Sequence, residues 1–126
     1  MTKKTLIFVF LFLACMIQAW EEGEEADLGE GIFITDITVG DGHYFADFFF
    51  IVENRSEIDF DEVIIEVTFK TPNGEMVKSY IDRLLHLKAG SEGLGELRHL
   101  PRKVLFSKTV EDQKIVSFRL FYFYAE

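Results

Sequence analysis

A cluster of acidic side chains in the middle of the chain is the first candidate for chemistry. Its members are Glu57, Asp59, Asp61 and Glu62. Calcium sites use about 6–8 oxygen ligands, often from an acidic loop with a central glycine. Apolar residues interrupt this cluster, and it contains no glycine. The sequence therefore predicts no resident metal or other cofactor, and a weak calcium-dependent binder stays as an alternative.

One basic region lies within this otherwise acidic chain. It contains Arg98, His99, Arg102 and Lys103, with Lys108 a few residues further on. Grouped cations could bind an anionic surface or the acidic segment of another copy. Scattered charges on a solvated loop would give the same composition. We treat the first four residues as a candidate binding patch and keep the solvated loop as the alternative.

Residues suited to catalysis are present, but not in catalytic patterns. The histidines His43, His86 and His99 lack metal-ligand spacing, although His43 lies close to Asp41 in sequence. No serine sits in a Gly-x-Ser-x-Gly turn, and no glycine-rich phosphate loop is present. We therefore expect no enzymatic activity. The alternative is a small enzyme or metal-dependent binder that uses loop carboxylates.

The N-terminus has the layout of a secretion signal. Lys3 and Lys4 precede nine consecutive apolar residues, 6–14, and the small residue Ala19 precedes the first acids. Nine apolar residues are too few for a bilayer span, which needs about 20, but they suit a signal core. We expect residues 1–19 to be a signal peptide, so that the protein is secreted or periplasmic. This signal does not decide the host kingdom.

Cys15 opens a second processing route. The sequence before it, residues 11–14, loosely resembles a bacterial lipoprotein box, and Ala14 fits that pattern while Phe12 and Leu13 do not. Cys15 is therefore a lipidation candidate beside ordinary cleavage after Ala19. Cleavage after Ala19 would leave no cysteine, which excludes disulfides and thiol chemistry from the processed chain.

The charge balance limits the partners. The whole chain has a formal charge of −9, and removing Lys3 and Lys4 leaves 11 basic residues against 22 acidic ones. Nucleic-acid binding depends on cations that neutralise phosphates, so we expect no nucleic-acid partner. We expect another protein as the partner. Membrane contact would come only through a lipid at Cys15 or an uncleaved signal, and the oligomeric state stays open.

An acidic stretch follows the predicted signal. Residues 20–31 contain six acidic residues, three glycines and no basic residue. Like charges repel each other and glycine resists ordering. We predict a flexible tether here, followed by one domain over residues 32–126.

The domain shows the two-residue rhythm of β-strands. In residues 62–70, Val63, Ile65, Val67 and Phe69 alternate with mostly polar residues, which predicts a half-buried strand. Residues 44–52 are apolar on both faces, and in residues 115–124 the alternation places Tyr122 and Tyr124 with the core residues. Further strands are predicted at 33–39, 75–81, 94–97 and 104–106, and the leucines at 84–87 precede a turn. About seven strands with no helical spacing predict a small antiparallel immunoglobulin-like β-sandwich.

Phenylalanine is abundant, with 14 residues. Large aromatic side chains can stabilise a small core without disulfides. An alternative use is binding, with Phe45, Phe49 and Phe121 covering a partner or ligand on an outer sheet face.

The segment from Phe48 to Met76 resembles the hairpin of FxLYD-type domains, which are small immunoglobulin-like modules of bacterial envelope proteins and lipoproteins. The matching features are the Val-x-Asn-x-Ser turn at Val52–Ser56, the alternating strand 63–69 and the turn 72–75. Lys70-Thr71 replaces the family's Tyr-Asp pair. The resemblance covers about 40 residues and implies an extracytoplasmic accessory or binding module. Asn54-Arg55-Ser56 also fits a glycan acceptor, which matters only in a eukaryotic host.

These features predict a non-enzymatic binding or structural module that is exported to the bacterial periplasm or cell surface. The alternative is a secreted subunit of a larger assembly that is joined by β-strand addition at an open sheet edge.

Overall fold

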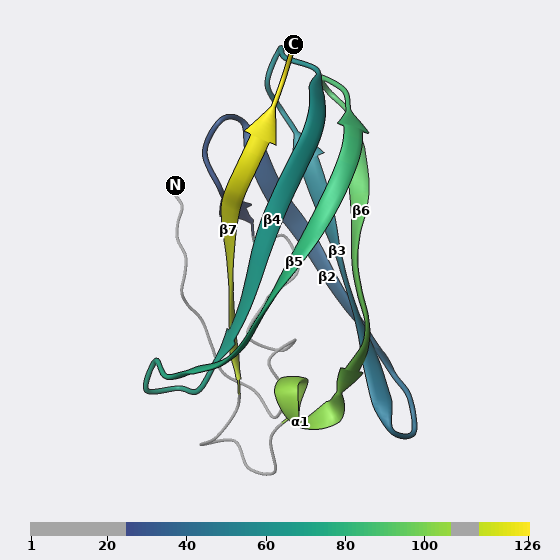
Figure 1. The fold of residues 1–126 in the computed structure, drawn as a ribbon, viewed down its shortest axis with the longest axis vertical. Coiled ribbons are helices and arrows are strands. Elements are labelled where there is room, and N and C mark those ends of the chain that lie inside the picture. The colour runs from purple at the N-terminus through teal and green to yellow at the C-terminus, as the bar shows by residue number, and fades with distance from the viewer. Residues whose placement is uncertain (1–24, 107–113) are drawn as a thin grey trace.

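The computed structural model describes residues 25–106 and 114–126, which form two antiparallel sheets packed face to face (Figure 1). One sheet has the order β1-β2-β3-β6, and the other has the order β5-β4-β7. The elements are β1 (Ala26–Asp27), β2 (Ile32–Asp41), β3 (Phe45–Asn54), β4 (Phe60–Lys70), β5 (Met76–Leu87), β6 (Glu92–Pro101), α1 (Arg102–Leu105) and β7 (Ile115–Tyr124). The predicted all-β sandwich of about seven strands is confirmed.

The core follows the alternation expected for β4. Val63, Ile65, Val67 and Phe69 are buried, whereas the residues between them are half-exposed. Phenylalanines join the two sheets: the ring of Phe48 on β3 lies 5.2 Å from that of Phe69 on β4. Rings in such edge-to-face contact add stability beyond the area they bury. The phenylalanines therefore stabilise the core, as the sequence analysis predicted.

The strand order matches the centre of an immunoglobulin-type sandwich. In that fold strand B pairs with E, and F lies between C and G. Here β3 pairs with β6, and β4 pairs with β7. These pairs occupy the positions of B with E and of C with F. The position of G, beside β7, is not filled by any strand within the described ranges 25–106 and 114–126.

A β-bulge at Phe121 makes the predicted alternation in β7 wrong beyond Leu120. Leu120 lies opposite Ile65, but Tyr122 lies opposite Ile64, so one residue of β7 is extra. An extra residue exchanges the two faces of the strand beyond it. Phe123 is therefore the core-facing residue, and its ring lies 5.6 Å from that of Phe60. Tyr122 and Tyr124 point outward instead.

Two predicted boundaries also differ from the structure. The predicted tether 20–31 contains β1, because Ala26 pairs with Ile34 and is buried; residues 20–24 lie outside the described residues. Residues 102–105 form the short helix α1, so the predicted strand at 104–106 is wrong. Its Val104 and Leu105 are buried, and an apolar run this short fits a helix as well as a strand.

The side of the sandwich formed by β5 and β6 is closed. The backbones of these two strands approach each other closely across the two sheets, as Figure 1 shows. Gly93 makes this approach possible, because a Cβ there would lie 2.9 Å from Leu84 and 3.3 Å from Leu87. The backbone N–H of Glu96 on β6 also donates to Asp82 Oδ2 on β5, at 2.9 Å.

Asn54 joins two turns at the same side of the sandwich. Its side chain is fully buried, and its Nδ2 donates to the backbone oxygens of Ile58 (2.8 Å) and Leu87 (3.0 Å). Its Oδ1 accepts from the backbone N–H of Ser56 (3.0 Å) and from Ser56 Oγ (2.6 Å). These bonds satisfy a buried amide. They also leave Asn54 inaccessible to a glycan in the folded protein.

Candidate functional site

The strongest candidate for an interaction surface is the outer edge of β7. Among the described residues β7 pairs only with β4, so the backbone groups that face away from β4 have no strand beside them. Figure 1 shows β7 at the margin of its sheet, on the side opposite β5 and β6. Exposed strand edges of this length are templates for pairing with another chain.

Large apolar side chains gather at the C-terminal half of this strand. Phe121, Tyr122, Phe123 and Tyr124 are 50%, 46%, 42% and 47% exposed. We call these four side chains together with the unpaired backbone side of residues 115–124 the β7 edge. Scattered apolar residues are normal on a protein surface, but four successive aromatic residues that are each about half-exposed concentrate apolar area at one place, as interaction sites do.

The exposure of Phe123 indicates that a neighbouring strand is missing beside the β7 edge in the described part of the chain. Phe123 points toward the core, as its contact with Phe60 demonstrates. Its partner on β4, Val63, is fully buried. A core-facing aromatic side chain remains partly exposed when nothing covers it from the strand position beside it. An added strand with an apolar inward face would bury that area, which is favourable by about 25 cal/mol per Å².

The charges around the β7 edge are largely matched by neighbours. Arg119 Nε donates to Glu66 Oε1 on β4 at 2.8 Å, and the Arg119 guanidinium lies 5.1 Å from the ring centre of Phe121. The hydrogen bond from Arg119 lowers the pKa of the Glu66 carboxyl, against a smaller opposing effect of desolvation. Arg83 forms an ion pair with Glu62 on the same sheet. The aromatic surface is therefore flanked by neutralised pairs.

The candidate basic patch comes together in space, but its arginines are paired. Two β6 residues, Arg98 and His99, bulge opposite the single residue Asp47 of β3. Asp47 Oδ1 accepts from the backbone N–H of His99 at 2.9 Å, and Arg98 Nη1 lies 3.6 Å from Asp47 Oδ2. Arg102 forms an ion pair with Asp41. These carboxylates largely cancel the positive charge on which anion binding would depend.

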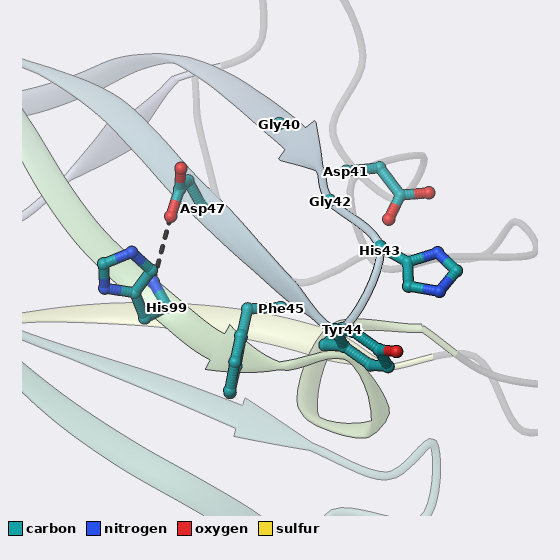
Figure 2. A pocket seen from close by; sticks show the side chains of 8 residues that line it. All are labelled: Gly40, Asp41, Gly42, His43, Tyr44, Phe45, Asp47 and His99. Atoms are coloured by element: carbon teal, nitrogen blue, oxygen red, sulfur yellow. Dashed lines mark hydrogen bonds between the residues drawn. The ribbon is translucent and has the colours of Figure 1, made fainter.

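An open hollow of about 470 Å³ lies between this patch and the β2–β3 turn. Figure 2 shows its lining, in which His43 and His99 lie apart on either side of Phe45. Ligand pockets of similar volume usually enclose most of the ligand, whereas this hollow is a shallow surface feature. Its carboxylates make contacts within the protein, since Asp47 accepts from the backbone N–H of His99 and Asp41 forms an ion pair with Arg102.

The acidic cluster does not form a metal site in the described part of the chain. Asp59 Oδ1 accepts from the backbone N–H of Ala89, and Asp61 Oδ2 accepts from that of Glu126. Glu62 is paired with Arg83, and no group of three or more His, Cys, Asp or Glu side chains in the described ranges could hold a metal ion. Glu57 is on the exposed turn before β4. The calcium alternative therefore gains no support from the geometry.

The three phenylalanines considered for binding do not share one surface. Phe45 and Phe49 lie on the outer face of the four-stranded sheet, where the guanidinium of Arg98 lies 5.2 Å from the ring centre of Phe49. Phe121 belongs to the other sheet, at the bulge of β7. Of the three, Phe121 alone lies in the run of exposed aromatic residues 121–124.

Phe121 was predicted as a surface residue from the sequence, whereas the exposure of Tyr122, Phe123 and Tyr124 was not predicted. Strict alternation along β7 places Tyr122 and Tyr124 on the core face, because it does not allow for an extra residue at a bulge. The available signal was the run of four aromatic residues at 121–124, which cannot all face inward from one strand.

Cys15, Lys108 and the predicted signal peptide lie outside the described residues. Within the described ranges, no helix is long and apolar enough to cross a membrane. Comparison with known proteins found no matching family model, no matching curated protein and no matching solved structure. The resemblance to FxLYD-type domains thus stays a prediction.

Proposed function

We propose that this chain is a non-enzymatic binding or structural module, exported to the bacterial periplasm or cell surface, that joins another protein by strand addition at the β7 edge. The observation that carries the proposal is the partly exposed, core-facing Phe123 in a ten-residue strand whose outer edge has no strand beside it among the described residues. In β-strand addition, main-chain hydrogen bonds supply affinity and alternate side-chain pockets supply specificity. The β7 edge offers main-chain groups that face away from β4 and exposed aromatic side chains.

The faces of β7 favour one kind of binding segment. The segment is extended, and apolar side chains alternate along the face that it turns to the core beside Leu120 and Phe123. Its other face lies level with Tyr122 and Tyr124 and can be polar or aromatic. A segment of about 5–8 residues, which is an ordinary strand length, would cover the C-terminal half of β7.

Selection from a displayed library of random octapeptides tests the strand addition. We expect the protein purified after expression of the full chain to enrich peptides with two-residue apolar periodicity. The double variant Phe121→Lys/Tyr122→Lys should bind these peptides at least about tenfold more weakly, because edge lysines oppose pairing. Equal binding by wild type and variant, or no enrichment, would contradict the proposal.

The matched control is Ile81→Lys/Leu85→Lys on β5. These two side chains are 55% and 52% exposed, close to the values at Phe121 and Tyr122, and the charge change is the same. They lie in the outer strand at the opposite side of the same sheet. We expect this control to bind the enriched peptides as well as wild type does.

Export is tested separately by mass spectrometry of the protein from a bacterial host that expresses the full chain. A periplasmic or extracellular product that begins at Trp20 supports ordinary cleavage, and a lipid-modified product that begins at Cys15 supports anchoring. A chain that keeps residues 1–19 in the cytosolic fraction would overturn the exported location.

A further inference from the structure

We propose that a second copy of this chain can fill the position beside β7, so that two β7 strands pair antiparallel about a twofold axis between Leu120 and Phe121. The two three-stranded sheets then form one continuous six-stranded sheet. This inference uses the edge named in the proposed function and adds the identity of one occupant.

The bulge at Phe121 restricts the registers that this pairing can adopt. An axis between Leu120 and Phe121 sets Phe118 opposite Phe123 of the other copy, and both residues face the core. The same axis sets Arg119 opposite Tyr122, and both of these residues face outward. A slip of one residue would set core-facing residues against outward-facing ones. This register therefore matches the two faces at Phe118 with Phe123 and at Arg119 with Tyr122.

The side chains that meet in this register suit each other. Phe118 and Phe123 would form a cross-strand aromatic pair, a type worth about 0.2–1 kcal/mol. Arg119 would meet the ring of Tyr122 in the other copy, where a guanidinium is attracted to the aromatic face. Because the interface is isologous, each pair occurs twice.

The charges along β4 and β7 also favour antiparallel pairing. Lys70 and Lys114 lie at one end of this strand pair, since Lys70 is opposite Ile115. Acidic residues gather at the other end, where Asp61 accepts from the backbone of Glu126. Glu62, opposite Tyr124 at this end, is already paired with Arg83. Antiparallel pairing brings the Lys114 end of one copy to the Glu126 end of the other. Parallel pairing would bring like charges together.

Self-pairing also explains how an exposed edge can be tolerated. Pairing of β7 with β7 is closed by its twofold axis, so it consumes both edges and cannot propagate. An unprotected edge strand with aromatic side chains would otherwise promote aggregation.

Disulfide cross-linking reads the register directly. In a Cys15→Ser background of the full chain, we expect Arg119→Cys/Tyr122→Cys and Ser117→Cys/Tyr124→Cys to form covalent dimers under mild oxidation, because directly opposed residues lie within disulfide reach. The recombined pairs Ser117→Cys/Tyr122→Cys and Arg119→Cys/Tyr124→Cys use the same four positions out of register. They should form several-fold less dimer, and equal yields from all four variants would overturn the register.

A second measurement needs no cysteine. Light scattering over a dilution series should show a monomer–dimer equilibrium for the wild type. Tyr122→Lys sets a lysine opposite Arg119 at two places and should raise the dissociation constant by about tenfold or more. Tyr122→Glu should keep the dimer, because it sets a carboxylate opposite the same arginine. Equal weakening by both variants would contradict the pairing of Arg119 with Tyr122.

Failure of this inference is distinguishable from failure of the proposed function. A protein that is monomeric at every concentration and forms no cross-link overturns self-pairing. If Phe121→Lys/Tyr122→Lys still abolishes peptide binding in that case, strand addition at the β7 edge stands with a different chain as the occupant.

Discussion

On the β5–β6 side of the sandwich two strands from different sheets close on each other, whereas on the opposite side β7 has no strand beside its outer edge among the described residues. A small residue and hydrogen-bonded polar side chains build the closed side: Gly93 leaves room for Leu84 and Leu87, Asp82 accepts from the backbone of Glu96, and Asn54 joins two turns. Large aromatic side chains occupy the open side. The described residues are thus tightly packed on one side of the sandwich, and on the other they leave large apolar side chains exposed along a strand edge.

The largest effect should come from Asn54→Ala on the closed side. The change removes four side-chain hydrogen bonds and leaves the buried carbonyl of Leu87 without this donor. Each unsatisfied buried group costs about 1–3 kcal/mol, so we expect urea unfolding to show a loss of about 3–5 kcal/mol. The control Asn73→Ala, in an exposed turn, should cost under about 1 kcal/mol. Similar losses from both changes would argue against a special role for Asn54.

Gly95→Ala should be the next most severe change. A Cβ at Gly95 would lie 2.2 Å from the ring of Phe50, which is buried in the core. Overpacking of this kind costs about 1–3 kcal/mol. Gly40→Ala is the control, because a Cβ there meets only Phe49 and Asp47 at 3.8 Å and 3.9 Å. Thermal unfolding should separate the two variants, and the same melting temperature for both would contradict this account of the core.

Asp82→Asn should have a small effect that depends on pH. Burial raises the pKa of the Asp82 carboxyl, and the hydrogen bond from the Glu96 backbone opposes this only in part. The folded state therefore holds the proton more tightly, so Asp82 contributes most stability below its unfolded pKa and loses it as pH rises.

Asparagine keeps an acceptor for Glu96 without the buried charge. At about pH 7 we expect Asp82→Asn to match or exceed wild type by less than about 1 kcal/mol, because the side chain is only half-buried. The wild type should regain this difference as pH falls towards about 3.9. Urea unfolding at both pH values measures it, and a difference that grows in the variant's favour at low pH would reverse the assigned sign.

The smallest effect on folding should come from changes at the β7 edge. Phe121→Lys/Tyr122→Lys and Ile81→Lys/Leu85→Lys alter side chains of similar exposure, so each should change the free energy of unfolding by about 1 kcal/mol or less. Only the first should impair strand binding. If it unfolds the protein instead, the aromatic residues of β7 serve the fold and not an interface.

The regular parts of the fold could be predicted because they depend on local alternation. Val63 to Phe69 alternate in sequence and in burial alike. The bulge at Phe121 depends on the register between β7 and β4, and an unbroken run of aromatic residues carries no alternation that would reveal it. Ala26 could not be assigned to a strand, because its short pairing with β2 lies in a segment dominated by acids and glycines.

The candidate sites could not be predicted fully either, because they also depend on contacts between residues far apart in the chain. The sequence placed Arg98 and His99 in one basic group, but Asp47, which pairs with both, is about fifty residues away in the chain. Asn54 was expected in a turn, and its bond to the carbonyl of Leu87 spans 33 residues. Long-range partners of this kind decide whether a polar residue is available for binding, and sequence spacing alone does not contain them.

The most direct test of strand addition at the β7 edge is nuclear magnetic resonance of the isotope-labelled protein with an enriched octapeptide. The account predicts shift changes over residues 115–124 and their β4 partners, with backbone-to-backbone contacts between the peptide and β7. Shift changes centred on β5, or on the hollow around His43 and His99, would contradict it.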